Sequence, residues 1–411
     1  MKKRIPYIIG LCIVVILLIF PFIYTGSNYE YLMHLWIMAF FYAILASSWS
    51  FLGGYAGQFS FGHMAFMAIG AYSSGLFANY VYLSSAPTRF CSGFKLGNVF
   101  MLFLDPIGVT TKKLTCLDLA KQAWPTDVVV SQPSVFWGIL LGIILGGVFG
   151  LLVGALVLRL RAAYLALFTI GFSEILRAAI SAEISITRGQ AGLRVRPLFP
   201  DGLTLFGKAY TAVDKIPPYF VMLFLLLLCL AVMLWLVHSR FGLFIRSLRE
   251  DEEVAATLGV NTVRYKILVF VISSMMAAAA GAVNAHYICI VTPNMLIILQ
   301  MSIVIAMAVI GGLENIISAA IGAIIISFSL EFLRNDFMVG SLIIDMSVWR
   351  LVFFGLLLML TLRFWQNGFI QPLIFKFSRL ARKKQSISKH RIPEIDLTDQ
   401  GSKEENEKCS N

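Results

Sequence analysis

The sequence predicts an all-α polytopic membrane protein, and three observations support this fold class. Hydrophobic residues make up 59% of the 411-residue chain, and charged residues make up only 13%. A soluble domain carries roughly 45–50% apolar and about 25% charged residues, so an ordinary globular enzyme and a disordered chain are both excluded. Apolar runs of about 20 residues recur, which is the length at which an α-helix crosses a bilayer. Helices are expected because each span must satisfy its own backbone hydrogen bonds in lipid.

Ten apolar runs are candidate transmembrane helices. The first follows Lys2, Lys3 and Arg4, but its apolar stretch is too long for a signal peptide and no cleavage site follows it. Residues 1–29 are therefore expected to form an uncleaved signal-anchor helix. The third run begins in a Gly-rich stretch, and the sequence leaves open whether it is continuous, broken or re-entrant. The ten runs are residues 5–24, 31–51, 59–83, 134–158, 162–182, 216–238, 265–288, 295–312, 316–333 and 349–368.

Basic residues determine the expected orientation. Lys and Arg are enriched in the cytoplasmic loops of membrane proteins. With the N-terminus in the cytoplasm, the basic loop 239–264 and the basic tail fall inside, whereas the connection 25–30, which has no Lys or Arg, falls outside. The net charge of +11 then follows from membrane topology, without a nucleic-acid partner. Residues 336–370 are expected to contain the last span, and residues 371–411 a basic, then mixed-charge, cytoplasmic tail beside membrane lipid.

Two spans carry small residues at a spacing that favours close helix packing. Gly142, Gly146, Gly150 and Gly154 recur every four residues and so share one helix face. The Ala-rich run 277–282 offers a similar face. Such faces let helix backbones approach one another closely, so they predict a tightly packed bundle but no particular chemistry.

The sequence contains no pattern that predicts catalysis or metal binding. It has no HExxH run, no Cys/His cluster with zinc spacing and no GxSxG elbow. Residues 202–209 nearly match a phosphate-binding loop, but Ala209 replaces the Ser or Thr that binds magnesium. We therefore expect no catalytic residue, no metal, no cofactor and no ATPase site in this chain. Cys91 and Cys116 share one polar loop, and the sequence leaves open whether they form a disulfide.

The loop between the sixth and seventh spans is the most informative segment. Residues 250–253 are four consecutive acids, which favour a helix N-terminus. Val254, Ala255 and Leu258 then form a small apolar surface, and Gly259 can end the helix. A short helix of this kind fits a groove in a partner protein. The alternative is an amphipathic connector that lies on the membrane surface.

The run Glu253-Val254-Ala255, followed by Gly259, resembles the Glu-Ala-Ala-x-x-x-Gly coupling motif of bacterial ABC importer permeases, with Val254 in place of the first Ala. Further segments, in the same order, resemble the signatures of the branched-chain amino acid permease family, and most of all its LivM-type subunit. Arg188, Glu314 and a long loop at 84–133 depart from the family pattern. The resembling segments are residues 54–63, 66–72, 164–177, 187–193, 309–313 and 322–323.

The resemblance implies the ABC importer permease fold and a transmembrane permease subunit for branched-chain or related amino acids in the bacterial inner membrane. The permease core would cover residues 30–335, with the coupling loop at 239–264. The implied partners are a second homologous permease subunit, two subunits that bind the ATP, and an extracytoplasmic solute-binding protein. The residues expected to couple to the ATP-binding subunits are Glu252, Glu253, Ala255, Ala256 and Gly259.

Other functions stay open on the sequence alone. Within the family, urea or amides and simple sugars compete with branched-chain amino acids, and the apolar spans do not identify the solute. An ion-coupled secondary transporter is the alternative from another class, and uptake by the purified chain under an ion gradient alone would identify it. A membrane enzyme would need clustered titratable residues at one membrane face, and we find no such cluster.

Nine residues in the resembling segments are candidates for the translocation path. Glu174 and Arg177 lie three residues apart and so share one helix face. Charges within lipid are costly, so they are generally paired or functional. For each candidate the alternative is structural: a helix cap, a packing hydrogen bond or a local ion pair. The candidates are Gln58, Ser60, His63, Thr169, Glu174, Arg177, Thr187, Gly189 and Gly192.

Overall fold

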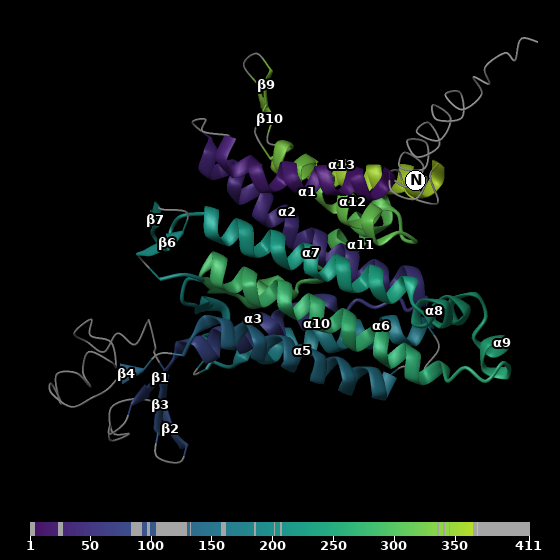
Figure 1. Cartoon of the computed structure of the whole chain (residues 1–411), viewed down its shortest axis with the longest axis horizontal. Coiled ribbons are helices and arrows are strands. Elements are labelled where there is room, and N and C mark those ends of the chain that lie inside the picture. The colour runs from purple at the N-terminus through teal and green to yellow at the C-terminus, as the bar shows by residue number, and fades with distance from the viewer. Residues whose placement is uncertain are drawn as a thin grey trace, which may run out of the picture.

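The computed structural model is a bundle of long helices that run side by side along one axis (Figure 1). Two short helices, α8 (Arg240–Glu250) and α9 (Glu252–Thr257), lie at one end of the bundle. Connections at the opposite end contain short strands. The bundle helices are α1 (Ile5–Ile23), α2 (Tyr29–Ser50), α3 (His63–Asn79), α5 (Val135–Val157), α6 (Ala162–Ala182), α7 (Ile216–His238), α10 (Thr262–Ile288), α11 (Ile298–Gly311), α12 (Ile316–Phe332) and α13 (Met346–Phe364).

The structure describes most of the chain between residues 5 and 368. Cys91, Cys116 and the tail 371–411 lie outside the described residues, so the expectations for them stay predictions. The described residues are 5–23, 28–83, 93–96, 99–103, 130–131, 133–157, 162–184, 186–200, 202–205, 208–334, 337–339, 342–344, 346–364 and 368.

The described helices fit a multi-pass membrane protein. Five of them are long and apolar enough to cross a bilayer by length and composition. The pair α11 and α12 qualifies only as one unit, and it is bent by 119° at the break, which gives up to six spans. The predicted number of ten spans therefore stays a prediction. The five are Tyr29–Tyr55, Val135–Val157, Tyr164–Ala182, Ile216–His238 and Thr262–Ile288.

Helices α3, α5 and α10 pack against one another with their backbones in close contact. A Cβ atom added at Gly70 would lie 2.1 Å from the carbonyl oxygen of Ala278, and one added at Gly142 would lie 2.7 Å from the carbonyl oxygen of Gly70. At Gly146 it would lie 2.3 Å from the Cβ of Ala278. These distances leave no room for a side chain at the three glycines. The close packing predicted from the Gly-rich and Ala-rich faces is therefore confirmed.

Helix α2 forms the other part of the core, where it packs against α7 and α12. Trp49, Phe40 and Tyr219 are fully buried there, and the ring centres of Phe40 and Tyr219 are 5.3 Å apart. Aromatic side chains at this separation contribute both buried area and ring–ring attraction. The second span is therefore an interior helix of the bundle.

The entry to the third span differs from the prediction. Helix α2 continues into a π-helical turn, η1 (Phe51–Tyr55), and residues 57–62 are not helical. Gly57 has a φ of 68°, a conformation that glycine adopts readily but that ends a right-handed helix. Helix α3 begins only at His63, instead of residue 59, and is continuous to Asn79. The broken segment therefore precedes the helix and does not interrupt it.

Most of the described chain is helical, as expected, but several connections contain short strands that the sequence analysis did not predict. Segments rich in Tyr, Val, Phe, Leu and Ile favour strands once they leave the bundle, where they pair to satisfy their backbones. The largest sheet is antiparallel, in the order β2-β3-β1-β4, and β1 takes up the predicted end of the third span. Its strands are β1 (Tyr80–Leu83), β2 (Gly93–Leu96), β3 (Val99–Phe103) and β4 (Val130–Ser131).

Three further strand pairs complete the connections. One of them, β6 (Leu203–Leu205) with β7 (Lys208–Tyr210), occupies the segment that nearly matches a phosphate-binding loop. An antiparallel pair differs from the loop before a helix N-terminus that such a site requires. The other two pairs are β5 (Leu193–Arg194) with β8 (Ile290–Val291), and β9 (Phe337–Val339) with β10 (Leu342–Ile344).

Helix ends differ from the predicted ones by a few residues, each for a local reason. Helix α10 begins three residues early because the side chain of Asn261 accepts a hydrogen bond from the Arg264 amide. Helix α11 begins three residues late because Pro293 opens a 3-10 turn, η3 (Pro293–Leu296), ahead of it. Such caps and turns set helix ends more finely than apolar length can.

Candidate coupling surface and translocation path

The predicted short helix of the 239–264 loop is present as α9. The Asp251 carboxylate accepts hydrogen bonds from the amides of Glu253 at 2.9 Å and Val254 at 3.1 Å. These amides have no partner within the helix, so Asp251 is its N-cap. After the helix, Gly259 has a φ of 82° and its amide donates to the Ala256 carbonyl oxygen. Both predicted ends of this segment, an acidic start and a glycine stop, are confirmed.

Helix α9 and its C-cap Leu258 expose their larger apolar side chains, whereas a small one is buried. Ala255 is 2% exposed, whereas Val254 is 53% and Leu258 is 78% exposed. Glu252 is held by Lys266 at the start of α10, with 2.5 Å between the carboxylate oxygen and Nζ. The helix is thus attached to the bundle at its start and presents apolar surface outward. Glu253, Ala256 and Gly259 are also exposed.

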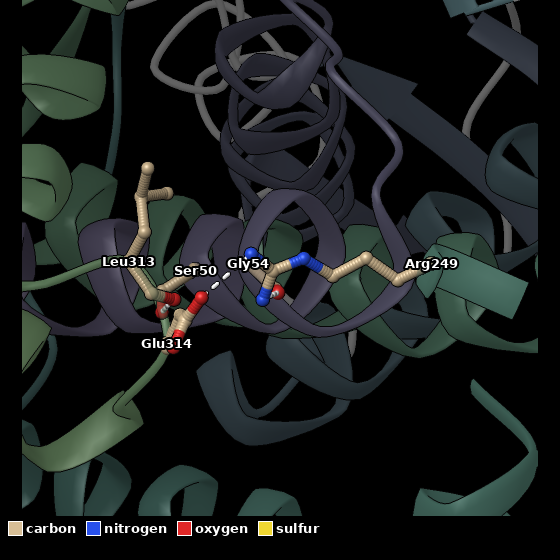
Figure 2. Close-up of polar contacts among 5 residues, drawn as sticks. All are labelled: Ser50, Gly54, Arg249, Leu313 and Glu314. Atoms are coloured by element: carbon tan, nitrogen blue, oxygen red, sulfur yellow. Dashed lines mark hydrogen bonds and ion pairs between the residues drawn. The ribbon is translucent and has the colours of Figure 1, made fainter. Parts of the chain in front are cut away.

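Arg249, near the end of α8, joins two other segments (Figure 2). Its Nη1 donates to the Gly54 carbonyl oxygen at 2.7 Å, and its Nη2 lies 2.7 Å from Oε1 of Glu314. The Ser50 hydroxyl donates to the Leu313 carbonyl oxygen, also at 2.7 Å. The end of α8, the π-helical turn and the connection between α11 and α12 therefore meet at one place.

A second arginine of α8 contacts the same turn. The guanidinium carbon of Arg246 lies 5.2 Å from the ring centre of Tyr55, within the range of a cation–π contact. Arg246 and Arg249 are three residues apart and so share one helix face. This spacing is visible in the sequence, but the partners are 195 positions away for Gly54 and 65 for Glu314. Sequence reasoning therefore missed the junction.

Four predicted path residues lie around the non-helical segment before α3. The Phe61 amide donates to Oγ1 of Thr169 at 3.0 Å, which ties this segment to α6. Trp49 Nε1 donates to the Ser60 carbonyl oxygen at 2.7 Å, and the Ser60 hydroxyl accepts from the Gly62 amide. Ser60 and Thr169 therefore hold the segment in shape.

Gln58, in this segment, and His63, the first residue of α3, are buried and have side-chain atoms without hydrogen-bond partners among the described residues. Nε2 of His63 lies 2.7 Å from the hydroxyl of Ser273, which itself donates to the Ser48 carbonyl oxygen. A hydroxyl that has already donated its proton can only accept here, so Nε2 carries the ring proton. Among the described residues, Nδ1 of His63 and both amide atoms of Gln58 have no hydrogen-bond partner. Gln58 and His63 thus differ from Ser60 and Thr169, whose side-chain oxygens all have hydrogen-bond partners.

Glu174 and Arg177 form the local ion pair that their spacing predicts. Nε of Arg177 lies 2.7 Å from Oε2 of Glu174, and the side chains are 33% exposed for Arg177 and 40% exposed for Glu174. Ile175, beside them on α6, is 72% exposed. The pair therefore lies on the outer face of the bundle of this chain.

Thr187, Gly189 and Gly192 shape a tight turn after α6. The Thr187 hydroxyl lies within hydrogen-bond distance of the Ile180 carbonyl oxygen, at 2.8 Å. Gly189 and Gly192 have φ values of 51° and 81°. A Cβ atom at Gly192 would lie 2.8 Å from the side chain of Thr292, so the turn seats against the segment after α10. The nine candidates thus fall in three places, and the described contacts do not join them into one lining.

A buried histidine on α10, which sequence reasoning missed, holds the same end of the bundle. Nδ1 of His286 donates to the Arg196 carbonyl oxygen at 2.7 Å, and its Nε2 lies 2.7 Å from the Ser74 hydroxyl. Burial lowers the pKa of the Arg196 guanidinium. Its ordinary pKa is so high that the group stays charged at neutral pH. This network links α3, α10 and the outer turn.

A cavity of about 380 Å³ lies where α2, α7 and α10 meet at the strand-bearing end. His34, Lys215 and Tyr287 line it, and Nδ1 of His34 lies 2.6 Å from the Tyr287 hydroxyl. Nζ of Lys215 donates to the Glu30 carbonyl oxygen at 2.9 Å. The cavity is built by segments far apart in sequence, so no motif indicates it. Within the part of the chain that the structure describes, no group of three His, Cys, Asp or Glu side chains could hold a metal ion.

Several described helices are apolar and long enough to cross a bilayer, which defines the class as a multi-pass membrane protein. Residues 31–362 match the family model described as branched-chain amino acid transport system / permease component. The chain belongs to this family. The predicted resemblance is therefore confirmed.

Individual relatives agree with the family. The high-affinity branched-chain amino acid transport system permease protein LivM of Escherichia coli K12 is 33% identical over 47% of this chain and 51% of the relative. LivM of Salmonella typhimurium LT2 is 32% identical over the same shares. LivH of Escherichia coli K12 is 30% identical over 36% of this chain and 47% of the relative. The chain thus spans about half the length of the curated relatives it matches. No solved structure matches it.

Proposed function

We propose that this chain is the transmembrane permease subunit of an ATP-binding cassette importer for branched-chain or related amino acids. A second homologous permease subunit completes the translocation path in the bacterial inner membrane. Two further subunits bind and hydrolyse ATP on the cytoplasmic side, where both termini of this chain lie. An extracytoplasmic solute-binding protein delivers the solute. The chain itself has no catalytic residue and no cofactor of its own.

The exposed apolar face of α9 carries this proposal. Helix α9 lies at one end of the bundle (Figure 1), and Val254 and Leu258 are exposed in the same short segment as the acidic residues at the helix start. Exposed apolar groups next to a polar rim are typical of a protein-binding surface. The Glu252–Lys266 ion pair and the buried side chain of Ala255 hold α9 against the bundle, while the Asp251 cap stabilises the start of the helix itself. A partner that pushes on such a held helix would move the bundle with it.

The mechanism follows from these attachments. ATP-driven closure of the two partner subunits would displace α9, and α8 and α10 would transmit the displacement because both pack against it. Packed helices move as rigid bodies between discrete arrangements instead of deforming continuously. The path would then switch between outward-open and inward-open states.

Leu258→Asp tests the docking surface. The side chain is exposed, so the change should leave folding intact while it places a charge in the proposed interface. We expect the ATP-binding subunits no longer to copurify with the variant complex, and solute uptake in reconstituted vesicles to be lost. Val213→Asp is the matched control, because Val213 is 82% exposed at the strand-bearing end of the bundle. Normal copurification and uptake with Leu258→Asp would contradict the proposal.

A bulky residue at Gly259 is a weaker test. Nothing lies within 4 Å of a Cβ atom there, but the φ of 82° would strain any other residue. Reversing the charge of Glu253 avoids this problem. The side chain is exposed, and the residue 253 amide can still donate its hydrogen bond to Asp251 in the variant. We expect Glu253→Lys to raise ATP hydrolysis relative to uptake.

The solute class rests on the names of the relatives, which are branched-chain amino acid permeases. Urea, amides and simple sugars are the competing solutes within the family. Calorimetric titration of the partner solute-binding protein with leucine, urea and a hexose would separate them. Leucine-like ligands alone should bind.

A further inference from the structure

We propose that Arg249 is a positioning residue that transmits the movement of α9 to two bent segments of the bundle. The first segment is the π-helical turn η1 with the non-helical residues 57–62. The second is the connection between α11 and α12, residues 312–315. This inference rests on the proposed function, because it concerns how a displacement of α9 would reach the translocation path.

The place of Arg249 in the chain suits this role. It lies two residues before Asp251, the N-cap of α9, so a displacement of α9 acts directly on it. The body of α8 is anchored, because Ile245 and Leu248 are buried against the bundle. The end of α8 is therefore the point at which the exposed α9 meets the packed helices.

The guanidinium contacts both bent segments at once. It donates to the Gly54 carbonyl oxygen and pairs with Glu314, each at 2.7 Å, as Figure 2 shows. The aliphatic part of the Arg249 side chain packs against Gly57, because a Cβ atom added at Gly57 would lie 3.4 Å from Cγ of Arg249. The Gly54 carbonyl lies at the end of η1, where carbonyls lack helical partners, and a cation there is favourable. The Arg249 side chain therefore caps the end of η1 and forms an ion pair with the connection between α11 and α12.

The two segments are themselves in direct contact. A Cβ atom at Gly54 would lie 1.8 Å from the Leu313 carbonyl oxygen, which also accepts from the Ser50 hydroxyl. Gly312, the residue before Leu313, has a φ of 125°, and the α11–α12 pair is bent by 119° at this break. Bends held by glycine are points where helices can change direction. Arg249 thus contacts the junction of two such bends.

The Arg249–Glu314 ion pair is too exposed to contribute much to the stability of the fold, which indicates another role. The side chains are 36% exposed for Arg249 and 47% exposed for Glu314. Exposed pairs contribute little to folding, because water screens them and ordering two long side chains costs entropy. A contact that is easily broken and remade fits a junction that changes shape during each cycle. The segment it holds contains Gln58, a buried residue whose side-chain amide has no hydrogen-bond partner in the described part of the chain.

The test measures uptake per ATP hydrolysed in the complete complex reconstituted in vesicles. We expect Arg249→Gln and Glu314→Gln each to lower this ratio, by roughly three- to tenfold. Copurification of the ATP-binding subunits and the unfolding temperature should not change. The exchange of both charges, Arg249→Glu with Glu314→Arg, should restore part of the ratio. Arg240→Gln, an exposed arginine at the start of α8, is the control and should behave like the wild type.

Each outcome decides the matter. An unchanged ratio in Arg249→Gln and Glu314→Gln, with normal ATP-dependent uptake by the wild type, would overturn the inference and leave the proposed function intact. A loss of uptake that accompanies lost docking or a lower unfolding temperature in both single variants would make Arg249 structural and overturn the inference. A wild-type complex that shows no ATP-dependent uptake would overturn the proposed function and the inference with it.

Discussion

The buried polar residues near the predicted path fall into two groups: those whose side chains have hydrogen-bond partners and those whose side chains have none among the described residues. The Thr169 hydroxyl accepts from the Phe61 amide and lies within reach of the Leu165 and Ala166 carbonyl oxygens, so its capacity is filled. Local structure explains such a residue completely. Gln58 is also buried, but its side-chain amide has no hydrogen-bond partner among the described residues. An unpaired buried amide is costly, so of the two Gln58 is the better candidate for a solute contact.

Glu174→Gln separates a path residue from a structural one. The amide keeps the shape of the carboxylate and can still accept from Arg177, but it removes the charge. Because the pair is partly exposed, its loss should cost little stability. If Glu174 lines the path, we expect a severalfold lower rate of uptake in vesicles, with the complex still assembled.

A second pair, at the end of another helix, serves as the control. Glu331 and Arg334 have the same spacing, with 3.1 Å between Nη1 and Oε1. Glu331→Gln should leave uptake unchanged. Equal uptake by Glu174→Gln and the wild type would mean that Glu174 forms only a local ion pair and does not line the path. Lost assembly of the complex would instead assign Glu174 a structural role.

Sequence spacing predicted contacts within one helix but not between segments. The Glu174–Arg177 pair followed from helix periodicity, and the acidic start and the glycine stop of the α9 segment followed from local backbone rules. The Arg249–Glu314 contact spans 65 positions, and no local rule relates such residues. Glu314 stood out in the sequence only as a charge where the family has small residues. A charge in an unexpected place is a signal to search for its partner.

Elements were predicted where apolar length is decisive and missed where it is not. Long helices such as α7 and α10 lie within a few residues of their predicted ranges, because about 20 apolar residues can hardly form anything else in lipid. The π-helical turn η1 was missed because its residues are as apolar as the helix before it. The strand β1 was missed for the same reason, since hydropathy does not distinguish a helix end from a paired strand.

Gly70→Ala tests the packing of α3, α5 and α10. The added methyl group would lie 2.1 Å from the Ala278 carbonyl oxygen, which is backbone and cannot rotate away. Helix α3 must therefore shift, at a cost of about 1–3 kcal/mol for overpacking. We expect a lower unfolding temperature in detergent.

The matched control for this substitution is Gly171→Ala. On α6, nothing lies within 4 Å of a Cβ atom at Gly171, so only the higher helix propensity of alanine acts. Gly171→Ala should be neutral or slightly stabilising. An unchanged unfolding temperature for Gly70→Ala would mean that the three helices can separate at little cost.

At the scale of the whole molecule, the two ends of the bundle are built differently. One end carries α8 and α9, with their acids and arginines, and the other carries the strands and the turn after α6 (Figure 1). The first end has exposed apolar side chains on a held helix, which suits a partner that moves. The tight outer turn and the His286 network hold the second end. This asymmetry matches the proposed inward and outward faces of an importer.

The orientation of these ends is the most decisive prediction for the whole chain. We expect α9 to face the cytoplasm, because Lys and Arg cluster in the loop that contains it. Single cysteines at Leu258 and at Val213, which are both highly exposed, would report the two ends in a variant without the six native cysteines. In intact cells, a thiol reagent that cannot cross membranes should label Val213→Cys at once and Leu258→Cys only after the membrane is opened. The reverse pattern would place α9 outside the cell, where no ATP-driven subunit could reach it, and every step from α9 to the bundle would then lack a source of motion.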